Sequence, residues 1–542
     1  MTPETKWRIA VAALIAIASL RVASTYYRLS ATTDEPAHIA CGMEWLEGKM
    51  GLYEYQHPPL ARAMIGLPLY LSGVRSAGLR EIWPEGWSIL YADEHSRDRL
   101  ALARLGTLPF LVLGAVVVGL WAKRWFGPWA GLWAVFLFLC LPPILAHSGQ
   151  ATLDMGATAT CALALYQLLR WREEPTMRRA LILAAAFTLA LLCKFSVPAF
   201  FVIGAVLGWL GIRHGEAPKL SAGLLLKQAA AALGLMLVLV WAGYRFHVQP
   251  MFSADDRDLV KVGMERVFGN HSAVARVVDP LFGVSTPFGG LFRGFAEVAN
   301  HDAKGQPSFL LGTVRDTGIW YFFPVVLAVK TPIGFAVLAL IGLGAALWRF
   351  RGAKWQHRVT ALFALGILLV CMTSRINRGV RHVLPIYAPL AVLAGGAAAN
   401  LTTKRKWFWV PLALSAWLVA VSVWAHPDYL PYFNELALGH PEKILVDSDL
   451  DWGQDLGRLS ARLREKHVDH IGIQYWGGEL IEHAGLPPFT KIKPREETAG
   501  YVAISIHDLY TGHAADGSWD WLYRLEPVER IGHSINLYYV RE

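Results

Sequence analysis

Residues 361–372 read ALFALGILLVCM, twelve positions without a charged side chain. Residues 9–20, IAVAALIAIASL, form a second run of this kind, and others recur along most of the chain. With its flanks, each run reaches the roughly 20 residues that a helix needs to cross about 30 Å of hydrocarbon. A helix also satisfies its own backbone there, and the periods do not match those of barrel strands. The sequence therefore predicts a polytopic α-helical membrane protein.

The composition agrees with this prediction. Hydrophobic residues make up 54% of the 542 positions and charged residues only 17%, whereas soluble proteins carry about a quarter charged residues. The net charge is +9, but the basic residues stand in short clusters between apolar runs and not in one stripe, so we expect no nucleic-acid partner. The five cysteines lie mostly within apolar runs, which fits neither a disulfide framework nor a zinc site.

A window of about 20 residues predicts roughly eleven spans. They fall at residues 7–28, 101–122, 127–146, 151–170, 179–194, 196–212, 222–245, 320–348, 359–375, 381–400 and 407–425. Basic clusters occur at 123–124, 170–179, 213–219, 349–358 and 404–406. If the N-terminus is inside and the first span is not cleaved, alternation places all five clusters in the cytoplasm, as the positive-inside rule requires. The loops 29–100 and 246–319 and the C-terminus then lie outside.

The chain divides into a predicted membrane domain, residues 1–425, and an extracytoplasmic tail, residues 426–542. In the tail we expect strands at 444–446, 470–475, 501–506 and 535–540, and a helix at 453–466 with Leu456, Leu459 and Leu463 on one face. This alternation predicts a small α/β domain. In the first outer loop, residues 60–72 are apolar but too short to cross, so we expect them at the membrane interface.

Residues 32–38, TTDEPAH, follow the first span. The adjacent carboxylates of Asp34 and Glu35 are candidates for a general base, because burial or a nearby charge can tune one of them. The simpler interpretation is that Thr33 or Asp34 caps a helix beginning near Pro36. From spacing alone, the cap is favoured.

Two further residues on the outer side are candidates for substrate binding. In the sequence HPP at 57–59, the prolines fix an extended backbone, so that His57 either faces the same cavity as Asp34 or belongs only to a turn. Asp154 lies near the outer end of a span, where an ionised acid costs on the order of 3 kcal/mol and usually faces a wet cavity or a partner. A shallow helix cap is the alternative for Asp154.

Cations also gather on the outer side. Lys194 lies at a predicted boundary between two spans, and residues 375–382, RINRGVRH, contain Arg378, Arg381 and His382. This cluster runs against the positive-inside tendency, which makes a phosphate an obvious partner. Snorkelling to lipid headgroups is the alternative.

The tail carries carboxylates at alternate positions in DSDLDWGQD, residues 447–455. A calcium loop of the EF-hand type needs Gly and Glu where this segment has Trp452 and Arg458, so that interpretation fails twice. A strand-to-helix turn with capping acids is the better interpretation.

Together these motifs resemble the GT-C superfamily of membrane glycosyltransferases, in the branch of the protein O-mannosyltransferases and the lipid A aminoarabinose transferase. The resemblance rests on Asp34 and Glu35 with His38, on HPPL at 57–60, on LDM at 153–155 and on RH at 381–382 before LPIY at 384–387. In layout it covers about residues 1–425.

The resemblance implies an inverting transfer of a hexosyl or pentosyl group from a polyprenyl-phosphate donor to a lipid, glycan or protein acceptor. The reaction would take place at the periplasmic face of a bacterial inner membrane. The site residues would be Asp34 and Glu35 as catalytic carboxylates and His57, Asp154, Lys194, Arg378, Arg381 and His382 as substrate ligands. Asp34 would be the base and Arg381 the main ligand of the phosphate. The resemblance leaves open whether a divalent metal binds near Asp154.

Two other classes compete with this hypothesis. A transporter or flippase of lipid-linked sugars predicts inverted repeats and charges near the membrane midplane. A non-catalytic membrane scaffold predicts only that the tail binds a partner. The charges gather at one predicted surface and no repeat is visible, which favours the enzyme.

Overall fold

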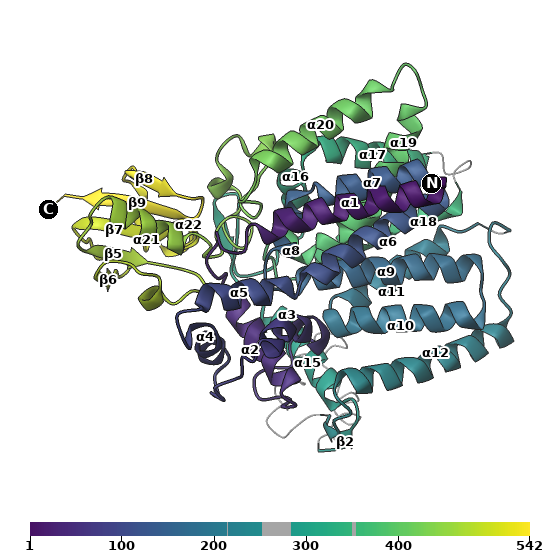
Figure 1. The fold of residues 1–542 in the computed structure, drawn as a ribbon, viewed down its shortest axis with the longest axis horizontal. Coiled ribbons are helices and arrows are strands. Elements are labelled where there is room, and N and C mark those ends of the chain that lie inside the picture. The colour runs from purple at the N-terminus through teal and green to yellow at the C-terminus, as the bar shows by residue number, and fades with distance from the viewer. Residues whose placement is uncertain (214, 252–282, 349–353, 542) are drawn as a thin grey trace.

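The computed structural model describes residues 1–213, 215–251, 283–348 and 354–541. Most of the chain is a bundle of helices, and a small α/β unit lies at one end of it (Figure 1). The predicted helical fold is therefore confirmed. Parts of the outer loop 246–319 and of the basic cluster 349–358 lie outside the described residues.

Each of the eleven predicted spans coincides with a helix or a pair of helices. The bundle contains α1 (Pro3–Ala23), α5 (Ser96–Leu105), α6 (Leu108–Phe126), α7 (Pro128–Leu139), α8 (Pro142–Ser148), α9 (Asp154–Glu173), α10 (Met177–Cys193), α11 (Val197–Leu210), α12 (Ala222–Gly243), α16 (Phe322–Lys330), α17 (Ile333–Trp348), α18 (Trp355–Thr373), α19 (Tyr387–Thr402) and α20 (Trp409–Trp424).

Four helical stretches within the described ranges are long and apolar enough to cross a membrane: Ser96–Phe126, Ala222–Gly243, Trp355–Thr373 and Leu384–Thr402. Two bent pairs, α7 with α8 and α16 with α17, turn by 66° and 120° and would raise the number to six. The total of eleven crossings stays a prediction.

Close contacts between small residues hold the bundle together. At Gly395 of α19 a Cβ would lie 2.6 Å from the carbonyl oxygen of Ala130 in α7, so only glycine allows these two helices to approach so closely. Small residues at such crossings are typical of helix packing in membranes. The indole of Trp121 is fully buried between α6 and α18, where its N–H donates to the Thr360 hydroxyl at 3.2 Å.

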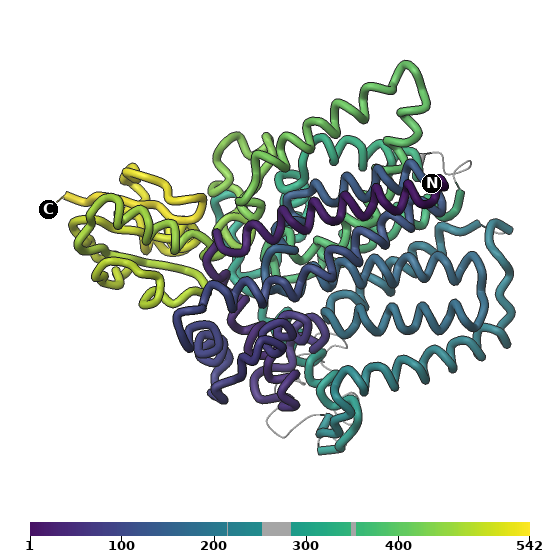
Figure 2. Tube along the Cα trace, in the orientation of Figure 1, coloured from purple at the N-terminus to yellow at the C-terminus, as the bar shows by residue number. Residues whose placement is uncertain are grey.

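The two ends of the bundle differ. The turns after α6, α9, α11 and α19, which carry predicted cytoplasmic basic clusters, lie at the same end as the N-terminus (Figures 1 and 2). The α/β unit lies at the opposite end, with α2 (Glu35–Leu46), α3 (Pro59–Leu71) and α4 (Ile82–Tyr91) nearby. This arrangement agrees with the charge alternation in the sequence.

The tail forms a five-stranded mixed sheet in the order β6-β5-β7-β9-β8. The strands are β5 (Ile471–Gln474), β6 (Phe489–Lys491), β7 (Gly500–Ser505), β8 (Glu529–Ile531) and β9 (Ile535–Val540). β5 runs parallel to β6 and β7, and β9 runs antiparallel to β7 and β8. Leu456, Leu459 and Leu463 of α21 (Leu456–Glu465) pack on one face, as the sequence predicted. The helices α22 (Ile506–Asp516) and α23 (Asp520–Tyr523) contribute to a second core with Val502 and Ile504.

Two local predictions in the tail are wrong. Residues 444–446 form no strand, because Ile444 and Leu445 close a turn by donating their amides to the Pro441 carbonyl. The helix predicted at 453–466 begins only at Leu456, after a turn in which Gly453 has φ 89°. Trp452 and Tyr429 of the tail pack in the hydrophobic core of the bundle, so the first part of the tail packs directly against the helices.

Candidate active site

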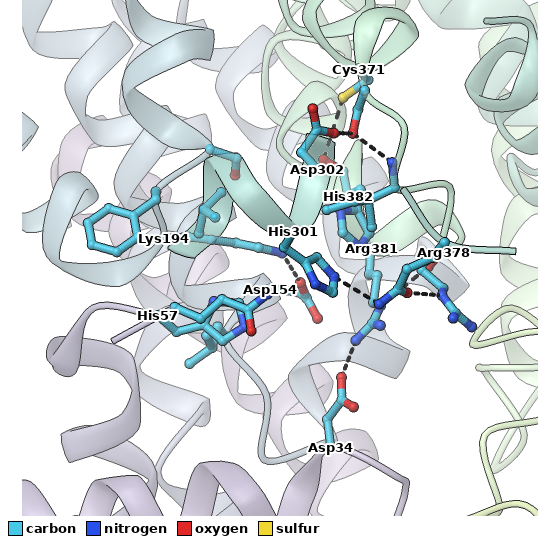
Figure 3. Close-up of a pocket in the computed structure, with 18 of the residues that line it drawn as sticks. Asp34, His57, Asp154, Lys194, His301, Asp302, Cys371, Arg378, Arg381 and His382 are labelled. Atoms are coloured by element: carbon cyan, nitrogen blue, oxygen red, sulfur yellow. Dashed lines mark hydrogen bonds and ion pairs between the residues drawn. The ribbon is translucent and has the colours of Figure 1, made fainter. Parts of the chain in front are cut away.

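One cavity of about 860 Å³ is lined by residues of the helical bundle together with residues of the tail. It brings together side chains from the loop before α2, the start of α9, the turn between α10 and α11, α15 (Gly289–Lys304), the turn after α18 and the tail. Seven of the eight predicted site residues line it: Asp34, His57, Asp154, Lys194, Arg378, Arg381 and His382. Figure 3 shows these seven around a common space.

Asp34 occupies the position before α2 that a helix cap would take, but its side chain makes no capping hydrogen bond. Its carboxylate instead pairs with the guanidinium of Arg381 at 2.5 Å, across 347 positions of sequence. The Asp34 side chain is 29% exposed and lines the cavity. The helix-cap interpretation is therefore wrong for Asp34, and the carboxylate faces the space in which a substrate would bind.

Glu35 is the exception among the predicted site residues, because it does not line the cavity. Its carboxylate is fully buried and pairs with both Nε and Nη2 of Arg104 at 2.8 Å. The backbone amides of Thr32 and Ala151 also donate to it at 2.8 Å. Burial opposes ionisation, but Arg104 and these amides outweigh it and lower the pKa of Glu35. The structure thus gives Glu35 a structural role in place of the predicted catalytic one.

The two arginines come from a short turn, residues 378–382, that ends in the 3₁₀ helix Val380–His382. Gly379 has φ 85°, and a Cβ there would lie 2.7 Å from the Asp449 carboxylate, so the turn requires glycine. Nε of Arg378 donates to Gln306 at 2.7 Å, and its guanidinium pairs with Asp447. Arg378 and Arg381 are therefore both held by carboxylates while they line the cavity.

A second ion pair lies across the cavity. Lys194, at the end of α10, donates to the Asp154 carboxylate at 2.6 Å (Figure 3). His147 lies 3.9 Å from the other oxygen of Asp154. The side chain of Asp154 is 3% exposed, so it is too deep to be the shallow cap that the sequence allowed. Asp154 is instead an acid with a charged partner, which is the other possibility that the sequence analysis gave.

Two histidines add neutral donors and acceptors. His38 and His57 meet edge to face with ring centroids 5.7 Å apart. They approach because α2 and α3 touch at glycines: a Cβ at Gly42 would lie 2.2 Å from the Arg62 carbonyl oxygen. Burial lowers the pKa of His38 to about 4 and that of His57 well below its usual value. Both rings are therefore uncharged at neutral pH.

The tail supplies cavity residues that the sequence analysis missed, namely Asp447, Trp452 and Trp476. The Arg381 guanidinium lies over the Trp452 ring, 4.5 Å from its centroid, while the Trp476 ring stacks on His507 at 3.9 Å. The Trp452 carbonyl also accepts from the Thr33 amide at 3.2 Å. The tail therefore contacts both the loop that carries Asp34 and the Arg381 side chain.

The alternate carboxylates of 447–455 explain how the tail docks. Asp447 pairs with Arg378, Asp449 accepts from the Val380 amide at 3.0 Å, and Asp455 accepts from the Ser534 hydroxyl at 2.8 Å. Burial acts to raise the pKa of Asp447, but Arg378 and His507 outweigh it and hold that pKa low. Within this one segment, some acids therefore contact the helical bundle and others contact the sheet. In the sequence, the acidic segment 447–455 together with the outer basic cluster 375–382 could have predicted this contact.

Other residues missed from the sequence come from α15 and the loop after it. His301, Asp302 and Gln306 line the cavity, and Asp302 accepts from the Ser374 hydroxyl and the Arg375 amide at 2.9 Å. No motif marked this region. Lys330, by contrast, is buried and donates to the carbonyls of Leu430 and Asp449 at 2.7 Å, and it is absent from the cavity lining.

The donor set does not favour a metal. Within the described ranges, no three His, Cys, Asp or Glu side chains gather as metal ligands. Asp154, the predicted candidate, is already neutralised by the ammonium group of Lys194, which a cation would have to displace.

The family comparison agrees with the resemblance seen in the sequence. Residues 98–244 match the model of a family described as dolichyl-phosphate-mannose-protein mannosyltransferase. This segment of the chain therefore resembles the membrane mannosyltransferases that the family description names. The matched segment includes Asp154 and Lys194 but neither Asp34 nor Arg381.

Particular proteins with solved structures are similar over most of the chain. ArnT from Cupriavidus metallidurans, bound to undecaprenyl phosphate, is 15% identical with a TM-score of 0.49, and the match covers 97% of each chain. The oligosaccharyltransferase AglB from Archaeoglobus fulgidus is 13% identical with a TM-score of 0.49, over 94% of this chain and 72% of that one. These structural similarities do not establish an activity of this chain. Among curated proteins, no match to the sequence was found.

Proposed function

We propose that the chain is an inverting glycosyltransferase that uses a polyprenyl-phosphate-linked sugar and acts at the outer face of the membrane. The observation that carries the proposal is the ion pair between Asp34 and Arg381 in the wall of the cavity. It places a carboxylate able to accept a proton beside a cation able to bind phosphate. The family description, which names a dolichyl-phosphate sugar, supports the same donor class.

The donor phosphate would bind the cations of the cavity. In the free protein, Arg381, Arg378 and Lys194 are each paired with a carboxylate. A phosphate offers oxygens that accept charge-assisted hydrogen bonds from such groups. When it takes Arg381, the Asp34 carboxylate loses its counterion and becomes available as a base. Donor binding and activation of the base are therefore linked through Arg381.

The reaction is a single displacement. The acceptor hydroxyl oxygen attacks the anomeric carbon, and its proton passes to Asp34. The bond from the anomeric carbon to the phosphate oxygen breaks with its electron pair on that oxygen, so polyprenyl phosphate leaves and the configuration inverts. Arg381 and Arg378 stabilise the negative charge that develops on the leaving phosphate. Asp34 then releases its proton to water.

His57 would bind the sugar, because its neutral ring donates and accepts hydrogen bonds without competing for the phosphate, and His382 would contact the substrate from the wall segment that carries Arg381. Asp154 would hold Lys194 in position through their 2.6 Å contact. The acceptor would be a lipid, a glycan or a protein that reaches the cavity from the outer side. Membrane lipids surround the helices in any of these cases.

The test is transfer by the purified full-length chain in lipid nanodiscs supplied with polyprenyl-phosphate sugars and a membrane extract as the acceptor source. We expect Asp34→Asn to lower turnover at least about a hundredfold, the lower end of what a general base contributes. Asp93→Asn is the matched control, because it removes an acid that is 46% exposed on the same outer side and outside the cavity. Nuclear magnetic resonance of the product reports the anomeric configuration.

Full activity of Asp34→Asn would exclude Asp34 as the base. A product with retained anomeric configuration would exclude a single displacement. The transporter hypothesis predicts movement of the lipid-linked sugar without formation of a new glycosidic bond. The scaffold hypothesis predicts neither movement nor bond formation. The ion pairs of Arg381, Arg378 and Lys194 gather in one cavity that the tail helps to line, which supports transfer over transport.

A further inference from the structure

A second pocket, of about 250 Å³, lies on the other side of the loop that leads to Asp34. Its walls come from the loop after α1, the end of α4, the start of α5 and α21 of the tail. Four arginines line it: Arg28, Arg97, Arg458 and Arg464. Glu479 is the one carboxylate among the residues that form its wall.

The arginines differ in how their charge is used. Arg458 pairs with Asp428 at 2.8 Å and with Asp455 at 2.7 Å, so its charge is balanced. Arg97 makes a longer-range interaction with Glu479. In the described part of the chain, Arg28 and Arg464 have no hydrogen bond or ion pair through their guanidinium groups. The pocket therefore carries unbalanced positive charge.

The pocket lies where the bundle meets the outer surface. Arg28 lies in the loop that follows α1, and Ser96 begins the 31-residue helical stretch that ends at Phe126 and is long and apolar enough to cross a membrane. Tyr26 and Tyr27 also line the pocket, and tyrosine is typical of the level of lipid headgroups. Topology does not require arginines here, because basic residues that orient a membrane protein belong on the cytoplasmic side.

We propose that this pocket binds the phosphate of an anionic phospholipid headgroup in the outer leaflet. Basic pockets at the ends of membrane helices bind such headgroups, and guanidinium groups suit phosphate oxygens. Arg28 comes from the bundle and Arg464 from the tail, so a bound phosphate joins the two. The Gly457 amide already donates to the Ser30 hydroxyl at 3.0 Å beside the pocket. The headgroup strengthens this contact of α21 with the base-bearing loop.

The experiment uses the full-length chain in nanodiscs of phosphatidylcholine with and without a minority of phosphatidylglycerol. Native mass spectrometry measures the phosphatidylglycerol retained by the protein. Arg28→Gln with Arg464→Gln should lower its affinity by on the order of 30-fold, since each cation near an anionic surface contributes about one kcal/mol. Arg495→Gln with Arg524→Gln is the control, because it removes two exposed charges of the tail that lie outside the pocket.

Equal loss in the pocket variant and the control, or no loss in either, overturns the proposal. A second arm titrates the protein in detergent with inorganic phosphate and anionic lipid in competition. Displacement of the lipid by millimolar phosphate would identify a soluble phosphate as the ligand and overturn the headgroup assignment. Because neither arm measures sugar transfer, the outcome is independent of the glycosyltransferase proposal.

Discussion

Two acid–arginine pairs begin one residue apart in the chain and differ in almost every physical respect. Asp34 and Arg381 line the cavity with side chains that are 29% and 15% exposed. Glu35 and Arg104 are 0% and 1% exposed, and the Glu35 carboxylate accepts from two amides besides the guanidinium. The comparison teaches that burial and saturation with donors, more than residue type or position, separate a structural carboxylate from one open to substrate.

The energetics of the two pairs follow from this difference. A buried ion pair with all its hydrogen bonds made is costly to break, because either partner alone would be an uncompensated charge. An ion pair with access to water contributes at most about 1 kcal/mol in most measured cases. Arg381 can therefore exchange Asp34 for a phosphate at low cost, whereas Arg104 cannot exchange Glu35.

Glu35→Gln breaks the buried pair and should have the largest effect on stability. It leaves Arg104 buried without a counterion, so we expect the free energy of unfolding to fall by about 3–5 kcal/mol. Thermal unfolding in nanodiscs measures this loss. Asp34→Asn should shift the unfolding midpoint far less. Equal shifts for the two variants would contradict the contrast between the pairs.

Asp451 sharpens the comparison, because it is a buried carboxylate that, within the described residues, pairs with no arginine or lysine. It accepts from the amides of Gly453 and His507, and burial raises its pKa to about 7. Between its unfolded pKa near 4 and this value, the folded tail binds more protons than the unfolded chain. Stability should therefore fall as pH rises from 5 to 7, by up to about 1.4 kcal/mol per pH unit.

His507 should add to this trend. Its folded pKa is raised, despite burial, by the Asp508 hydrogen bond and the charge of Asp447, so its contribution is present below pH 6.5 and lost above its folded pKa. Fluorescence-detected unfolding of the tail across this pH range measures the slope. Asp451→Asn should flatten it, and an unchanged slope in that variant would show that Asp451 ionises normally. Glu35 contributes in the opposite sense, since its lowered pKa makes its stabilisation disappear only in acid.

Arg381→Ala tests the cavity side of the comparison. Loss of a hydrogen bond to a charged group costs about 1.5–3 kcal/mol, so binding of polyprenyl phosphate should weaken about 10- to 100-fold. Arg381→Lys keeps the charge and should recover part of the affinity. Binding measured by isothermal titration in detergent gives both values, and an unchanged affinity in the alanine variant would exclude Arg381 as the phosphate ligand.

Trp452→Leu should give the smallest effect on donor affinity, because it removes the ring beneath Arg381 and leaves the charge of the guanidinium in place. Cation–π contacts contribute about 0.5–2 kcal/mol, so donor affinity should fall by two- to thirtyfold. Trp452→Phe keeps an aromatic ring and should restore most of it. Trp424→Leu is the control, since that indole is 77% exposed at the end of α20. A loss of stability in Trp452→Leu without any change in donor affinity would assign Trp452 to packing alone.

Much of the fold could be predicted because its signals are local. Apolar runs predicted the helices, and period-two alternation predicted β5, β7 and β9. The charge alternation predicted that Asp34, Asp154 and Arg381 lie on one side of the membrane, and all three line the same cavity. The failed strand at 444–446 has the composition of a strand, but its amides bond within a turn and not to a neighbouring strand.

The sequence by itself determined which segments are helices, where the charged side chains gather and the class of chemistry that they suit. Only the tertiary structure decided that Asp34 faces the cavity while Glu35 faces Arg104. It also decided that the tail supplies Asp447 and Trp452 to the site. The physical reason is that the direction and burial of a side chain depend on contacts between segments hundreds of residues apart. The spacing of residues along the sequence does not specify those contacts.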